Sequence, residues 1–180
     1  SSDGIPQFIL ITFDGALQET TLELSNKIAT ENNLNPNGDD IPFTYCVSTH
    51  YSNYHLIQQL HAKGHEIAVH TMTHTTDLNS SYDEWHAEIN GTRNALSELG
   101  QIPIEDIVGV CAPFLKHSDL SIAVLHQSGF LYDSSIPESP GHLSVNDQQC
   151  IWPYTLDTTG AQACHVDQCP PLSCPGLWEI

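Results

Sequence analysis

The chain has 180 residues, with 22 acidic residues against 4 basic ones and a formal net charge of −18. This length fits a single domain that can bury a core. A surface this negative repels phosphate groups, which disfavours nucleic acids and anionic membranes as partners, and no apolar run reaches the roughly 18 residues of a membrane-spanning helix.

Short apolar runs and amphipathic stretches alternate along most of the chain. The run 7–12 predicts a buried strand that leads into Asp14 and Gly15, and a helix is expected over 19–31. The alternation continues with a strand at 43–47, a helix at 54–63, a strand at 66–70, a helix at 82–99, a strand at 107–111, a helix at 119–127 and a strand at 130–133. We expect one domain over 1–180, in which 136–180 is an irregular segment rich in Cys and Pro that packs on the rest.

The predicted strands are too apolar to be half exposed. This pattern indicates a parallel sheet covered by helices, either a barrel or an open sheet. The turn after the first predicted strand lacks a Gly-x-Gly-x-x-Gly motif, which excludes the dinucleotide-binding version of such a fold.

Polar residues stand where several strands end. Asp14 ends the first predicted strand, His70 the third and Asp133 the fifth, and in α/β barrels the active site forms at these ends. His70 and His74 are four residues apart, a spacing at which both rings can hold one metal ion. Asp14 is either a metal ligand or general base, or a turn-forming aspartate before glycine.

Cysteine content and sequons point to an oxidising compartment. The chain has six cysteines, several of them clustered near its end, which favours disulfides. Asn79 and Asn90 each begin a glycosylation sequon. The chain starts at Ser1 without Met or a signal peptide, so we expect a processed or partial form of a secreted protein.

Several ordered segments resemble the polysaccharide deacetylases (carbohydrate esterase family 4), and most of all the animal chitin deacetylases. The resemblance runs from Phe8 to Ile180, and the segments that carry it are Ile11-Thr12-Phe13-Asp14, 64–70 with His74, 106–110, Ala112-Pro113-Phe114-Leu115-Lys116, 131–135, 152–157 and 175–179. It implies an α/β fold, a distorted (β/α) barrel with fewer than eight strands. It also implies a divalent metal, most often zinc, and hydrolysis of N-acetyl groups on chitin or a related polymer.

The resemblance also implies roles for individual residues. His70 and His74 would be two of three metal ligands, and Asp14 the catalytic base that takes a proton from water. The backbone N–H of Phe114 would help to hold the oxyanion. Trp152 is a candidate sugar-stacking residue, with packing inside its Pro-rich segment as the alternative.

Two positions depart from the family pattern. Gly15 stands where the family has the third metal ligand, an aspartate. Cys111 stands where the family has an arginine that orients the base, which leaves Asp14 without a charged partner. Cys111 could be a thiolate ligand, a buried free thiol or the disulfide partner of Cys46. The motif that carries the catalytic acid would fall beyond Ile180.

Two functions therefore fit the sequence. The first is a metal-dependent deacetylase of N-acetylated polysaccharides, weakened by these substitutions. The second is a catalytically inactive extracellular glycoprotein that binds carbohydrate or serves as a matrix component, which leaves extracellular assembly open. Neither involves nucleic acid or a membrane span.

Overall fold

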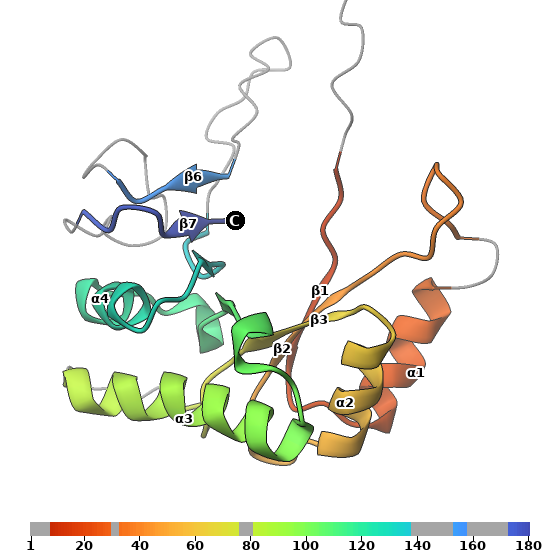
Figure 1. Ribbon diagram of the computed structural model, residues 1–180, viewed down its shortest axis with the longest axis horizontal. Helices are drawn as coiled ribbons and strands as arrows, with labels where there is room; N and C mark the ends of the chain where they lie inside the picture. The colour runs from red at the N-terminus through yellow and green to blue at the C-terminus, as the bar shows by residue number, and fades with distance from the viewer. Residues whose placement is uncertain (1–7, 30–32, 76–80, 138–152, 158–172) are drawn as a thin grey trace, which may run out of the picture.

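The computed structural model describes residues 8–29, 33–75, 81–137, 153–157 and 173–180. Within them one sheet has the strand order β1-β2-β3-β4-β5-β7-β6 (Figure 1). Neighbouring strands are parallel from β1 to β7, and β6 runs antiparallel to β7. The strands are β1 (Thr12–Gly15), β2 (Thr44–Val47), β3 (Glu66–Val69), β4 (Gly109–Val110), β5 (Tyr132–Asp133), β6 (Tyr154–Thr155) and β7 (Trp178–Glu179).

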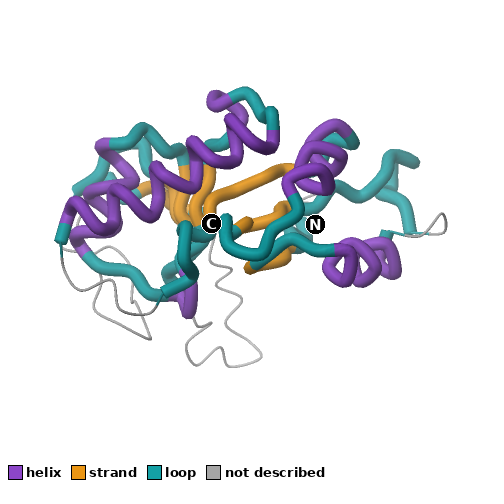
Figure 2. The backbone as a smooth tube through the Cα atoms, turned by 90° about the horizontal axis from the view of Figure 1, so that it is seen from below, coloured by secondary structure: helices purple, strands orange, loops and turns teal. Residues whose placement is uncertain are grey.

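The helices lie on the outside of the strands, and α3 lies alongside both α2 and α4 (Figures 1 and 2). The α-helices are α1 (Glu19–Ile28), α2 (Tyr54–Ala62), α3 (Tyr82–Gly100) and α4 (Asp119–Gln127), and two 3₁₀ helices are η1 (Ile104–Asp106) and η2 (Pro113–Leu115). None of the described helices has the length and apolar character needed to span a bilayer.

Side-chain caps determine where three of the helices begin. Asn53 accepts hydrogen bonds from two backbone N–H groups at the start of α2, and Ser81 accepts one at the start of α3. Ser118 and Ser121 form a reciprocal capping box at the start of α4. Each cap satisfies N–H groups that have no partner within the helix, which stabilises it by about 1 kcal/mol.

The core lies between the sheet and the helices. Val69 of β3 is fully buried, as are Ile57 of α2, Ile89 of α3 and Ile122 of α4. Burial of one such side chain contributes about 1.5–3 kcal/mol. The parallel strands and covering helices predicted from apolar patterning are therefore confirmed.

Two expectations about strands were wrong. The first strand was expected over 7–12, but β1 starts at Thr12, and the apolar side chains of Phe8, Ile9 and Leu10 are 71–76% exposed. In the described structure β1 is an edge strand, so little covers the chain before it. The second error concerns β6 and β7, which fall in the segment expected to be irregular. The two-residue strands β4 and β5 were predicted because each lies in a longer apolar run, whereas β6 and β7 lie among Pro, Gly and Cys residues.

Candidate metal and acid–base site

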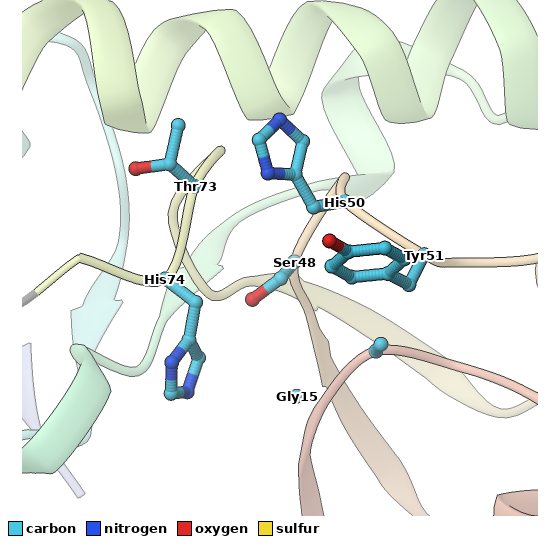
Figure 3. A pocket seen from close by; sticks show the side chains of 7 residues that line it. Gly15, Ser48, His50, Tyr51, Thr73 and His74 are labelled. Atoms are coloured by element: carbon cyan, nitrogen blue, oxygen red, sulfur yellow. The ribbon is translucent and has the colours of Figure 1, made fainter.

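The ends of β1, β2 and β3 meet at one edge of the sheet and surround a cavity of about 370 Å³ (Figure 3). Because these strands are parallel, the loops that follow them emerge on the same side. The cavity is lined by Gly15, Ala16, Ser48, His50, Tyr51, Thr73 and His74. Of the residues predicted for the site, His74 lines this cavity, whereas Asp14, His70 and Phe114 are not among its lining residues.

His70 follows β3 and is buried, with its Nδ1 2.6 Å from the carbonyl oxygen of Cys111. A carbonyl oxygen only accepts, so Nδ1 carries the hydrogen and the lone pair lies on Nε2. Burial lowers the pKa of His70, and the hydrogen bond to Cys111 and the nearby Asp14 carboxylate partly offset this effect. A neutral imidazole that donates its second N–H to a backbone carbonyl is the arrangement found in metal-ligating histidines.

His74 lies beside His70, with 5.0 Å between the ring centroids. The Phe114 ring packs edge-on against His74 at 5.1 Å, which brings the segment after β4 to the same place. The structure therefore assembles three residues that the sequence singled out separately: His70, His74 and Phe114. Two adjacent imidazoles are side chains of the kind that can hold a divalent metal ion.

Asp14 and a disulfide lie next to the histidines. Asp14 pairs in register with Cys46, and its carboxylate lies within 4.8 Å of the sulfur atoms of both Cys46 and Cys111. These two cysteines form a disulfide, and both are buried. Of the three alternatives for Cys111, the disulfide with Cys46 is confirmed. The two sulfur atoms are bonded to each other, so neither is a thiolate ligand in this structure.

Gly15 stands where the resemblance implies a third metal ligand. Its φ is +114°, in the region that L side chains rarely adopt, and a Cβ placed on it would meet nothing within 4 Å. The space for a ligand side chain is present, but the backbone conformation suits glycine. A side chain at this position would therefore fit the available space but not the backbone conformation.

A buried carboxyl group supports the segment that carries Cys111 and Phe114. Ser135 donates to Asp133 at 2.5 Å and accepts from the backbone N–H of Ala112 at 2.8 Å. Burial raises the pKa of Asp133 to about 6, and the hydrogen bond from Ser135, the nearby His117, and hydrogen bonds with the Ser134 backbone and the Glu179 side chain partly offset that rise. Asp133 thus affects the site indirectly, because the Ser135 hydroxyl links its carboxyl group to the backbone next to Cys111.

The other residues predicted from the sequence are those expected to bind sugar or to carry glycans. Trp152 and Asn79 lie outside the described residues. Asn90 lies inside α3, where its Nδ2 donates to Ser128 at 2.7 Å, and the sequon residue Thr92 is fully buried. A glycan on Asn90 would replace the bond to Ser128. Glycosylation at Asn79 and Asn90 stays a prediction.

Other residues of the site were not found by sequence reasoning. His50 and Tyr51 line the cavity from the loop after β2, and Glu88 of α3 binds the loop between the two histidines. The position of His50 after a predicted strand was the one available signal. No sequence signal pointed to Glu88, because a glutamate within a helix usually faces solvent.

The chain matches known proteins over most of its length. Residues 2–132 match the family model of the polysaccharide deacetylases. Chitin deacetylase 1 of Bombyx mori is 38% identical over 183 residues, which covers 98% of this chain and 33% of that protein. The chain thus spans about a third of the length of this curated relative.

Solved structures share the fold at low identity. A family 4 carbohydrate esterase from Streptomyces lividans, in complex with acetate, superposes with a TM-score of 0.58 at 19% identity, over 71% of this chain and 61% of that one. A mutant of a pseudoenzyme of the same esterase family, with restored enzymatic activity, gives a TM-score of 0.55 at 14% identity, over 67% and 42% of the two chains. The predicted distorted (β/α) barrel with fewer than eight strands is confirmed.

Proposed function

The chain belongs to the polysaccharide deacetylase family, and from this membership we propose that it hydrolyses N-acetyl groups of chitin or a related N-acetylglucosamine polymer, with weakened activity and with a divalent metal ion, zinc by preference. The observation that carries the proposal is the pair His70 and His74, with the Nδ1 of His70 bonded to Cys111 and its Nε2 available. His70 and His74 would hold the ion. When bound, it would polarise the N-acetyl carbonyl and lower the pKa of water.

Other residues of the chain carry out the remaining steps of the hydrolysis. Asp14, an exposed carboxylate at the end of β1, accepts the proton of the attacking water. The backbone N–H of Phe114, a residue whose ring packs against His74, donates to the oxyanion. The cavity beside Gly15 and His74 admits the acetylated sugar, and exposed Tyr51 at its rim offers an aromatic face.

Two features support weakened activity. Gly15 supplies no ligand, so the protein contributes fewer groups to the ion than its relatives are expected to. The Cys46–Cys111 disulfide next to Asp14 carries no charge and cannot orient the carboxylate as an arginine would. The same features support the second candidate, an inactive extracellular protein that binds N-acetylated polysaccharide.

We also propose that the protein is secreted. The Cys46–Cys111 disulfide supports this, because disulfides persist in oxidising compartments. The test of the main proposal is zinc-dependent release of acetate from chitin oligosaccharides. Acetate release would support the enzyme; zinc and oligosaccharide binding without acetate would support the inactive alternative.

A further inference from the structure

The segment His70–His74, here called the histidine loop, has an unusual backbone. Thr71 and His74 have φ values of 63° and 55°, in the left-handed region. Thr71 is β-branched and fully buried, which makes this conformation costly for it. Such a loop keeps its shape only where its surroundings hold it.

Glu88 of α3 binds the middle of the histidine loop through both carboxylate oxygens. Oε2 accepts from the backbone N–H of Met72 at 2.8 Å and of Thr73 at 2.9 Å. Oε1 accepts from the Thr73 hydroxyl at 2.9 Å. Hydrogen bonds to a carboxylate are stronger than those between neutral groups, and here three of them reach two consecutive residues.

A second contact with α3 lies one turn further along. A Cβ placed on Gly91 would lie 2.3 Å from Cε of Met72, so the Met72 side chain lies against the helix where Gly91 has none. The other side of the loop is held as well, because the Met72 carbonyl accepts from Thr49 Oγ1 at 2.8 Å and from the His50 N–H at 3.3 Å. Met72 and Thr73 are therefore fixed between α3 and the loop after β2.

We propose that Glu88 is a positioning residue that determines the separation and orientation of His70 and His74. It does not line the cavity, and it acts through the Met72 and Thr73 amides that lie between the two histidines. The inference rests on the proposed role of His70 and His74 as metal ligands. It adds that metal affinity depends on a helix outside the cavity, through one carboxylate.

The experiment measures amide hydrogen exchange by NMR in the metal-free protein and zinc affinity by competition with a chelator. The variants are Glu88→Ala, Glu88→Gln and, as a matched control, Glu98→Ala, which removes an exposed glutamate from the same helix. In Glu88→Ala we expect exchange at Met72 and Thr73 to accelerate at least about tenfold. Zinc affinity should fall about 10- to 100-fold, the usual effect of losing a group that orients metal ligands. Glu88→Gln keeps one acceptor oxygen, so it should retain most of the exchange protection at Met72 and Thr73 and most of the zinc affinity. Glu98→Ala should change neither quantity.

Two results would overturn the proposal: unchanged exchange at Met72 and Thr73 in Glu88→Ala, or wild-type zinc affinity despite faster exchange. Failure of the proposed function gives a different result. If the wild-type protein binds no zinc, the metal-dependent activity is wrong, and the exchange rates still decide whether Glu88 holds the loop.

Discussion

His70 Nδ1 and the carbonyl oxygen of Cys111 are 2.6 Å apart, so the residue that replaces the expected arginine still orients a candidate metal ligand through its backbone. The substitution at position 111 thus has unequal effects. The support of His70 is kept, because it needs only a carbonyl, while Asp14 faces a neutral disulfide. From this relationship we expect metal binding to be better preserved than base catalysis.

Removal of either histidine should abolish tight metal binding. We expect His70→Ala and His74→Ala to lower zinc affinity by more than about 100-fold, beyond the 10- to 100-fold usual for a group outside the ligand set. A competitive chelator titration measures this. His55→Ala serves as the control, because His55 is exposed on α2 and does not line the cavity. Unchanged affinity in His74→Ala would exclude His74 as a ligand.

Substitution of Gly15 separates backbone strain from ligand chemistry. Gly15→Ala and Gly15→Asp both place a side chain at φ +114° and should each destabilise the fold by about 1–2 kcal/mol. Only the aspartate offers a carboxylate, so it should bind zinc at least about tenfold more tightly than the alanine variant. Urea unfolding and zinc titration give the two quantities. Equal zinc affinity in both variants would show that position 15 does not face the ion.

The Cys46–Cys111 disulfide should contribute substantially to stability. It closes a loop with a sequence separation of 65, for which the chain-entropy model gives about 4 kcal/mol. The double variant Cys46→Ala/Cys111→Ala should lose roughly that amount in urea unfolding. Val110→Ala truncates another buried side chain of the same sheet and controls for the lost packing. A double variant as stable as the wild-type protein would contradict the predicted contribution of the disulfide to stability.

Asp133 should make stability depend on pH. Burial raises its folded-state pKa to about 6, above the value of 3.8 for an exposed carboxyl group. The folded state therefore binds the proton more tightly, and the contribution of Asp133 to the free energy of unfolding should fall as the pH rises from 4 to 6 and change little above that. Asp133→Asn does not titrate, so relative to the wild-type protein its stability should rise over this window, by up to about 3 kcal/mol. Chemical unfolding at pH 4, 5, 6 and 7 tests this, and parallel curves for the two proteins would contradict it.

The order of strands and helices and the approach of Asp14, His70 and His74 could be predicted from the sequence. Apolar runs mark buried parallel strands, and such strands place their ends at one edge. The cysteine pairing was left open, because a contact across 65 residues depends on how neighbouring strands align. The contact between Glu88 and the histidine loop has no local signal, because it depends on how α3 packs. The strands β6 and β7 were missed because they lie in a segment rich in Pro, Gly and Cys, without the longer apolar runs that surround β4 and β5.

The central claim is that His70 and His74 hold a metal ion while Asp14 acts as a weakly oriented base. The most direct measurement is acetate release from chitin oligosaccharides by the zinc-loaded wild-type protein and by Asp14→Asn. We predict slow release by the wild-type protein and at least about a 100-fold lower rate in the variant, with zinc affinity reduced no more than about tenfold. Equal rates in the two proteins, or no acetate from a wild-type protein with zinc bound, would contradict the account.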